Sequence, residues 1–469
     1  MPPSIWKPRL LAGYENNIWP GIPSPRATQL LSGLRTLAAT QWLSPSDLSQ
    51  LQLRQAAALV RYAARYVPYY RGRLQEAEIR AEAPALEPAI WERLPLLTRR
   101  DVQQAGVRLM SEALPRSHGT TSLMQTSGST GEPVRTQATG LTRYFWELFT
   151  LRDHQWHQRE LEGALASIRF FEKGTLGPPD GGSFRSWGGA TDGVFATGRG
   201  HGLDIRATIG EQATWLSRID PHYLLTYPSN LDALVDVCRG RGLRLQNLKE
   251  MRTIGEILIP GTRQACREAW GVPVVDMYTS AEFGYIALQC PEHEHLHVQS
   301  ENVLVEVLDD NGSPCPEGAI GRVVITALHN FATPLIRYEI GDYAEVGASC
   351  PCGRGLPVLK HVLGRSRNMV RLPGGERKWP IVGFREFRDI APIRQFQFIQ
   401  TNPDTLTARL VVDAPLTPGQ ETRVAEVVRR ALGHHFAIDF EYPRTIDRGP
   451  TGKFEEFICR VAEAPRVGS

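Results

Sequence analysis

Cysteine is scarce in this sequence: there are seven cysteines in 469 residues, and the number is odd. So few thiols do not make a disulfide framework for a chain of this length, which indicates reduced cysteines. A continuous apolar run is also missing from residues 1–21, which proline and glycine interrupt. Neither a signal peptide nor a membrane span is therefore expected there, and we predict a cytoplasmic protein without a membrane partner.

An excess of charge of one sign is also missing, because 53 basic residues face 50 acidic ones. The basic residues are spread along the chain, without the concentrated stripe that attracts a phosphate backbone, so nucleic acid is not an expected partner. No repeat of fixed period stands out, so a solenoid or propeller is not supported. The length and the 42% of hydrophobic residues predict an ordinary globular protein of two or more domains.

The hydrophobic pattern predicts an α/β protein. Apolar residues at helical spacings predict a helix over Leu51–Tyr66 that stops before Pro68, and the aromatic segment from Tyr144 is also helical in pattern. From Ile168 onward, short apolar runs that end in small polar residues are typical of buried strands, at whose ends ligands commonly bind. Alternating valines and a turn of Asp, Asn and Gly predict a β-hairpin over residues 303–324.

The segment Gln125–Val134, QTSGSTGEPV, combines two glycines with four hydroxyl side chains. Its backbone N–H groups and hydroxyls are suited to surround a polyphosphate, and glycine allows close backbone approach. It is not the Walker pattern, because the spacing and the lysine of that pattern are missing. Taken alone, such a loop is more often a surface connection, so its interpretation depends on the motifs that follow it.

Four further motifs follow in order: DMYTSAEFG, PLIRYEIGDYA, GRSRNMV and GPTGKFEEF. Together with the Ser/Thr/Gly loop, they resemble the adenylate-forming superfamily of acyl-CoA synthetases, luciferases and peptide-synthetase adenylation domains. The likeness is greatest to phenylacetate-CoA ligase-like proteins, including the branch found with capsular-polysaccharide genes. This resemblance covers nearly the whole chain. It implies an α/β fold with a large N-terminal domain, residues 1–364, that binds ATP and the acid, and a small mobile α+β lid domain, residues 365–469.

The resemblance also implies roles for single residues. Lys453 corresponds to the lysine that reaches the reacting carboxylate and phosphate oxygens, and Glu282 to the acidic residue that helps to hold Mg²⁺. Tyr278 corresponds to the residue that stacks on adenine, Asp342 to the carboxylate that binds the ribose hydroxyls, and Arg365 to a second nucleotide contact. The other expected nucleotide contacts are Thr126, Ser127, Gly128, Ser129, Thr130 and Gly131 of the phosphate loop, Gly255 and Glu256 of the adenine-edge loop, and Thr279 and Ser280.

These residue types agree with the chemistry. Joining a carboxylate to the α-phosphate of ATP brings anions together, so magnesium and a lysine are needed to neutralise the charge that develops. No protein nucleophile is required, and no Ser-His-Asp arrangement was found. The expected function is ATP-dependent activation of an organic acid, expected to be aromatic, to an acyl-adenylate with release of pyrophosphate, followed by transfer to coenzyme A.

Two alternatives stay open. Relatives often read GRSDDM and RGxNVFP where this chain has GRSRNM and LPGGERKWP, so the acceptor can also be an amine or a carrier-protein thiol. A catalytically silent nucleotide-binding protein is the alternative of another class, and the retention of Glu282, Asp342 and Lys453 argues against it. Candidates for the acid pocket are Phe145, Trp146, Tyr227 and Phe283, for each of which a core role is the alternative.

Three thiols and three histidines occupy two short turns, CPEHEHLHV and SCPCGRG. Tetrahedral zinc commonly takes three cysteines and one histidine, and some phenylacetate-CoA ligase-like proteins are similar to this chain in having such a cluster. We expect a closed structural zinc site, made of Cys290, His293, Cys350 and Cys352, with His295 or His297 as alternatives to His293. A zinc-dependent hydrolase is disfavoured because this set leaves no open position for water. Unconnected reduced cysteines are the remaining interpretation.

Overall fold

The computed structural model describes residues 6–76, 86–125, 134–171, 175–365, 368–374, 376–380, 384–449 and 452–461. Its first helices are α1 Pro25–Thr40, α2 Pro45–Tyr66, α3 Tyr70–Glu76, α4 Pro88–Arg93 and α5 Arg99–Ala105, followed by the 3-10 helices Gly106–Leu109 and Arg116–His118. Helices α1 and α2 each begin with proline after a serine whose side chain accepts a hydrogen bond from a backbone N–H. The predicted helix Leu51–Tyr66 is confirmed as the greater part of α2.

Among the described residues, a 12-stranded sheet has the order β11-β12-β13-β14-β10-β9-β8-β7-β6-β3-β5-β4. The bounds of its strands are β3 Leu165–Arg169, β4 Gly182–Phe184, β5 Gly200–Asp204, β6 Tyr223–Thr226, β7 Glu250–Ile254, β8 Val274–Ser280, β9 Gly284–Gln289, β10 Leu296–Val298, β11 Val303–Leu308, β12 Ile320–Ala327, β13 Tyr338–Val346 and β14 Val358–Arg365. Strands β5, β3, β6, β7 and β8 run parallel, and the remaining pairs are antiparallel. The predicted hairpin is confirmed, because β11 and β12 pair with Val303 opposite Ala327.

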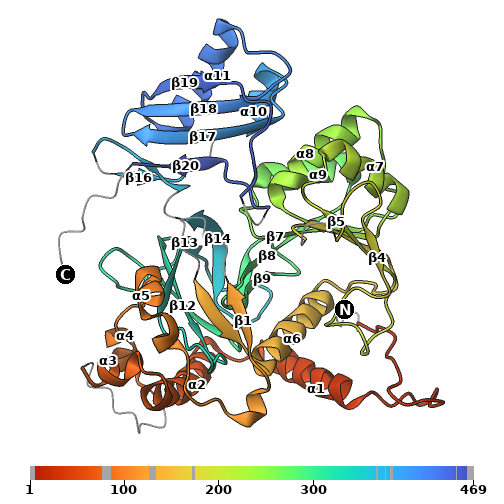
Figure 1. The fold of residues 1–469 in the computed structure, drawn as a ribbon, viewed down its shortest axis with the longest axis vertical. Helices are drawn as coiled ribbons and strands as arrows, with labels where there is room; N and C mark the ends of the chain where they lie inside the picture. Colours follow the sequence, from red (N-terminus) through yellow and green to blue (C-terminus); the bar gives the residue numbers. More distant parts are fainter. Residues whose placement is uncertain are drawn as a thin grey trace.

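Helices cover both faces of the parallel strands. Their bounds are α6 Gly140–Trp156, α7 Ile209–Ile219, α8 Pro228–Gly240 and α9 Pro260–Trp270. Helices α7 to α9 lie on one side of these strands, and α1 and α6 lie on the other (Figure 1). Trp215 of α7 belongs to one core cluster and Phe149 of α6 to another, and both side chains are fully buried. A third cluster joins α2, α4 and α5 to the antiparallel strands. The ends of the strands are thereby held rigidly where ligands are expected.

A separate core forms after β14, which ends at Arg365. The elements are β15 Val370–Arg371, β16 Arg377–Lys378, α10 Phe384–Ile390, β17 Gln395–Asn402, β18 Thr405–Val411, α11 Pro418–Leu432, β19 Ala437–Glu441 and β20 Phe457–Cys459. A four-stranded sheet of order β19-β18-β17-β20 packs against α10 and α11. In the view of Figure 1, this C-terminal domain lies above β13 and β14. The predicted fold class, a large α/β domain with a small α+β domain, is confirmed.

None of the described helices combines the length with the apolar composition that crossing a bilayer would need.

A buried ionic network fixes α6 against β7, the strand that leads to Gly255 and Glu256. Asp153 Oδ2 accepts hydrogen bonds from Arg159 Nη1 at 2.7 Å and from Arg252 Nη2 at 2.5 Å. These two arginines hold the pKa of the Asp153 carboxyl far below its usual range, against the opposing effect of burial. All three side chains are almost fully buried, so each charge depends on the others.

Replacement of this carboxylate, Asp153→Asn, is expected to lower the free energy of unfolding by about 3–5 kcal/mol, because two buried guanidinium groups lose their shared counter-charge. Urea denaturation followed by fluorescence measures the change. The matched control is Asp180→Asn, which breaks an exposed pair with Arg218, and its expected effect is below about 1 kcal/mol. Equal effects of the two substitutions would show that the network is not a stabilising unit.

Candidate active site

The predicted phosphate loop, Thr126–Gly131, lies outside the described residues, and its role stays a prediction. The strands that flank it are described: β1 Ser122–Gln125 and β2 Arg135–Ala138 pair antiparallel, with Gln125 opposite Arg135. The two ends of the loop therefore start from the same end of one two-stranded ribbon.

Three of the predicted nucleotide contacts come together from β8, β13 and β14. Tyr278 Oη donates a hydrogen bond to Asp342 Oδ2 at 2.6 Å, and Arg365 Nε lies 3.6 Å from Asp342 Oδ1. Asp342 and Arg365 also face each other as cross-strand partners in the β13–β14 pair. Burial, followed by the charge of Asp342, raises the pKa of Tyr278 well above its usual value, so its phenol stays neutral. The site thus offers an aromatic ring, a carboxylate and a guanidinium in one place.

Glu282 lies in the turn after β8, close to the same group. Ser280 accepts a hydrogen bond from the backbone N–H of Phe283 at 3.2 Å, which shapes this turn between β8 and β9, and Thr279 pairs with Tyr285 across it. Burial and then the negative charge of Glu282 raise the pKa of Tyr338 to about 12. Glu282 is only partly buried, and carboxylate oxygens are ligands that Mg²⁺ takes in proteins.

Lys453 reaches this group from the C-terminal domain. It keeps contact with solvent, but the surrounding protein displaces much of its water. This desolvation and then the positive charge of Arg365 lower the pKa of Lys453, and the carboxylates of Asp342, Glu256 and Glu282 oppose the change. A Cβ atom on Gly255 would lie 2.9 Å from Lys453 Cε, so the lysine crosses directly over the glycine backbone. One cation from the small domain therefore sits among the predicted nucleotide contacts of the large one.

The four candidates for the acid pocket differ in their surroundings. Tyr227 is buried and its Oη accepts a hydrogen bond from the backbone N–H of Phe170 at 3.3 Å. Phe283 is also buried, and Phe145 stacks on His329 with the ring centroids 3.9 Å apart. Trp146 is 46% exposed and lies over Gly284, the residue that follows the Glu282 turn. Among these four residues, Trp146 alone presents a large apolar surface next to the site.

The thiols and imidazoles of the two short turns converge at the other end of β9 and β10. Cys290 Sγ is 3.8 Å from Cys350 Sγ, and Cys352 Sγ is 3.5 Å from His297 Nε2. A tetrahedral zinc ion with ordinary bond lengths separates two thiolate ligands by about 3.8 Å and a thiolate from an imidazole nitrogen by about 3.5 Å. Both observed distances match these values, so the cluster fits a tetrahedral zinc ion.

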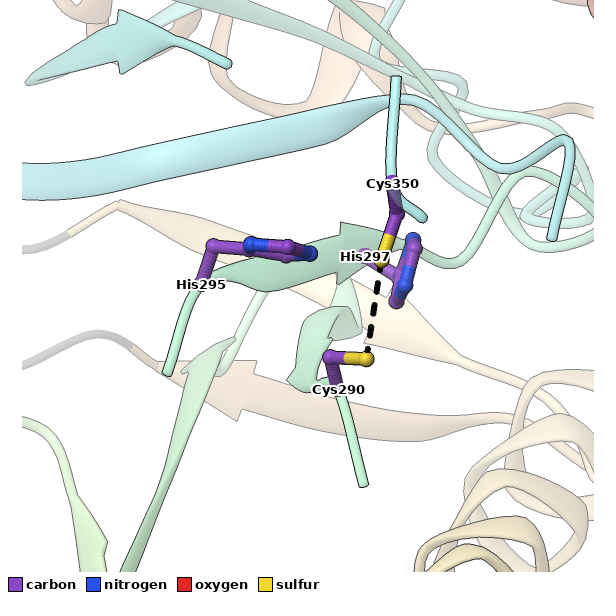
Figure 2. Close-up of side chains that lie close together, drawn as sticks. All are labelled: Cys290, His295, His297 and Cys350. Atoms are coloured by element: carbon purple, nitrogen blue, oxygen red, sulfur yellow. Dashed lines mark hydrogen bonds between the residues drawn. The ribbon is translucent and has the colours of Figure 1, made fainter. Parts of the chain in front are cut away.

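The histidines that join this cluster differ from the first expectation. One ligand atom from each of Cys290, His295, His297 and Cys350 lies within 4.8 Å of the others (Figure 2). His293 and Cys352 do not belong to this set; the ring of His293 stacks on that of His295, and Cys352 approaches the cluster through His297. His297 lies on β10 and His295 comes directly before that strand, and both imidazoles reach the cysteines, whereas His293 lies further back in the preceding bend.

The sequence reasoning gave no role to Arg448, which hydrogen-bonds to Ser229 and Glu256 across the two domains. Its position, five residues before Lys453 in the same segment, was the available signal.

The chain is similar to several known proteins. Residues 384–460 match the CapK C-terminal domain family. Phenylacetate-coenzyme A ligase of Thermus thermophilus is 27% identical over 344 residues, which cover 71% of this chain and 73% of that protein. Phenylacetate-coenzyme A ligase of Pseudomonas putida is 24% identical over 172 residues, which cover 35% of this chain and 38% of that protein. Among solved structures, 2-hydroxyisobutyryl-CoA ligase in the postadenylation state with 2-HIB-AMP has a TM-score of 0.69 and 21% identity, covering 87% of this chain and 88% of that one.

The fold is that of the acyl-CoA ligases, which form acyl-adenylates. In sequence the chain is similar to phenylacetate-coenzyme A ligases, and its residues 384–460 match the CapK C-terminal domain family, in agreement with the resemblance that the ordered motifs indicated.

The TM-score differs between two states of the same ligase. The same 2-hydroxyisobutyryl-CoA ligase with 2-HIB-AMP and CoA in the thioesterification state gives a TM-score of only 0.55, although 93% of this chain and 91% of that one are covered. The TM-score is therefore higher for the postadenylation state of that ligase than for its thioesterification state.

Proposed function

We propose that this protein activates a carboxylic acid as its acyl-adenylate and then transfers the acyl group to coenzyme A. A carboxylate oxygen of the acid attacks the α-phosphorus of ATP, and the bond to the β-phosphate breaks to release pyrophosphate. The thiol of coenzyme A then attacks the acyl carbon, loses its proton and displaces AMP. ATP and reduced thiols are cytoplasmic conditions, so we place the reaction in the cytoplasm.

The observation that carries this proposal is the approach of Lys453 Cε to Gly255 of the large domain, within the electrostatic influence of Asp342, Arg365 and Glu282. A cation there is suited to the negative charge that develops when two anions react, and Tyr278 with Asp342 is suited to the adenosine. Glu282 is the residue that we assign to Mg²⁺, which would neutralise phosphate charge when bound. The phosphate loop Thr126–Gly131 is assigned to the β- and γ-phosphates on its motif.

An aromatic acid is the substrate class that we favour. Trp146 is 46% exposed next to Gly284 and offers a flat apolar face, which suits an aromatic ring by stacking. The experiment measures pyrophosphate release with ATP and Mg²⁺ against a panel of aromatic, aliphatic and 2-hydroxy acids. Coenzyme A, amines and a carrier-protein thiol are then added separately. Pyrophosphate release without formation of an acyl-CoA thioester would indicate that an amine or a carrier-protein thiol is the acceptor. No pyrophosphate release with any acid would favour a silent nucleotide-binding protein.

We predict that Asp342→Asn raises the KM for ATP by about tenfold or more, because a hydrogen bond from a ribose hydroxyl to a charged group is replaced by one to a neutral amide. The matched variant is Tyr278→Phe, which removes only the Oη that donates to Asp342 and is expected to change KM less. Initial rates of pyrophosphate release at varied ATP measure both values. An unchanged KM in Asp342→Asn would remove this carboxylate from the nucleotide site.

The cluster of Cys290, Cys350, Cys352 and His297 is assigned to a structural zinc ion, with His295 as the neighbouring imidazole. Three thiolates and one imidazole complete a tetrahedral shell, so the ion is assigned no part in the reaction. It would instead connect the end of β9 to β10 and to the turn between β13 and β14.

A further inference from the structure

One carboxylate connects the two domains next to the reacting lysine. Glu256 follows β7 of the large domain, and its side chain is only 7% exposed. Its Oε1 accepts a hydrogen bond from the backbone N–H of Phe454 at 2.7 Å, and its Oε2 accepts one from the backbone N–H of Ser229 at 3.0 Å. Phe454 follows Lys453 directly. Glu256 therefore binds the backbone next to Lys453 and the backbone at the start of α8 at the same time.

Arg448 completes this contact from the C-terminal side. Its Nη1 donates to Ser229 Oγ at 3.1 Å and to the carbonyl oxygen of Gly452 at 3.1 Å, and it lies 3.4 Å from Glu256 Oε1. The backbone N–H of Gly449 donates to the carbonyl oxygen of Lys453 at 2.9 Å, and that of Gly452 donates to the carbonyl oxygen of Gly449 at 2.8 Å. The guanidinium thus joins the beginning and the end of the turn that carries Lys453, and joins both to the large domain.

Close packing leaves this turn no freedom where it meets the large domain. Gly452 has φ +76°, and a Cβ there would lie 2.7 Å from Ile205 Cγ2. Gly255 has φ +76° as well, and a Cβ there would lie 2.9 Å from Lys453 Cε. Glycine alone fits both positions without strain. The turn therefore fits against the large domain in only one position, and the hydrogen bonds of Glu256 determine the position of Lys453.

We propose that Glu256, together with Arg448, is a positioning pair that locks the C-terminal domain in the adenylation arrangement and is released for the transfer to coenzyme A. This inference rests on the proposed function. Both carboxylate oxygens of Glu256 accept hydrogen bonds from the protein, and one of the donors is the backbone N–H of the residue that follows Lys453, so the role that we assign to Glu256 is to hold the lysine turn. The similarity to a postadenylation state and the lower similarity to a thioesterification state agree with a contact that belongs to the first half-reaction.

The first test separates the two half-reactions in Glu256→Ala and Arg448→Ala. We expect the kcat of pyrophosphate release to fall about tenfold to a hundredfold in each, since a buried charge-assisted contact is lost, while the KM for ATP changes little. Thioester formation by Arg448→Ala from supplied acyl-adenylate and coenzyme A is expected to stay within about twofold of wild type, because that step does not use the pair. An equal loss in both half-reactions would overturn the proposal. A raised KM for ATP at unchanged kcat in Glu256→Ala would also overturn it, in favour of an adenine contact.

The second test needs no activity. Hydrogen–deuterium exchange without substrates is followed in peptides that span residues 448–457. Exchange in Glu256→Ala and Arg448→Ala is expected to be at least about tenfold faster than in wild type, because the Phe454 amide loses its buried acceptor. Asp413→Ala removes an exposed carboxylate of the same domain and serves as the control without change. Unaltered exchange in the two variants would refute the lock, whereas absent pyrophosphate release by the wild-type protein would refute only the proposed function.

Discussion

Lys453→Ala is expected to lower the kcat of pyrophosphate release by about a hundredfold or more, with the fold intact. The lysine belongs to the C-terminal domain but stands among Asp342, Arg365 and Glu282 of the large domain. A fixed cation stabilises the transition state more than the ground state, because negative charge develops between the attacking carboxylate and the α-phosphate. The loss should therefore appear in kcat and kcat/KM together, with little change in the KM for ATP.

The control for this prediction is Lys360→Ala, which removes a lysine that pairs with Glu345 on the exposed part of β14. It is expected to leave pyrophosphate release unaltered, and circular dichroism establishes that both variants are folded. Lys453→Arg is an additional variant: the position over Gly255 leaves little room, so the longer planar group is expected to restore only a small part of the rate. A rate unchanged in Lys453→Ala would remove the lysine from the reaction.

Sequence patterns predicted helices and strands correctly where residues only a few positions apart determine the structure. The spacing of leucines and alanines before Pro68 marks the end of α2, and the Asp-Asn-Gly turn specifies the hairpin of β11 and β12. Here the helix period, the strand alternation and the turn residues each act within a few positions, so the chain order alone contains the information. The motifs were predictable for another reason: their order along the chain resembles that of a family whose fold is the one observed.

Contacts between distant segments were not predictable in the same way. Three histidines at alternate positions look equivalent in the sequence, and only the pairing of β10 with β14 decides that His297 faces Cys352. Glu256 was assigned to the adenine on its place in a motif, but its neighbours are Phe454 and Arg448, which lie about two hundred positions away. Both choices depend on how strands and domains pack, and a single sequence gives no measure of that packing.

The zinc cluster leads to the second large prediction. Wild-type protein is expected to contain about one zinc ion per chain, and Cys350→Ser is expected to lose it and to lower the free energy of unfolding by about 3 kcal/mol or more. This is a fraction of the roughly 10–16 kcal/mol that structural zinc contributes in small zinc-binding peptides. The control, Cys315→Ser, alters a cysteine that the cluster does not include and should retain the metal. Elemental analysis and thermal unfolding measure the two quantities.

The position of the cluster predicts the order in which functions are lost. Cys290 directly follows β9, and His297 lies on β10. Cys350 and Cys352 lie in the turn between β13 and β14, the two strands that carry Asp342 and Arg365. Loss of zinc should loosen these strands from one another, because the metal replaces packing that the short β10 is too small to supply. During titration with a chelator, nucleotide affinity is expected to fall together with the onset of unfolding. Abolished turnover in a fully folded, metal-free protein would contradict a structural ion and would instead indicate a catalytic one.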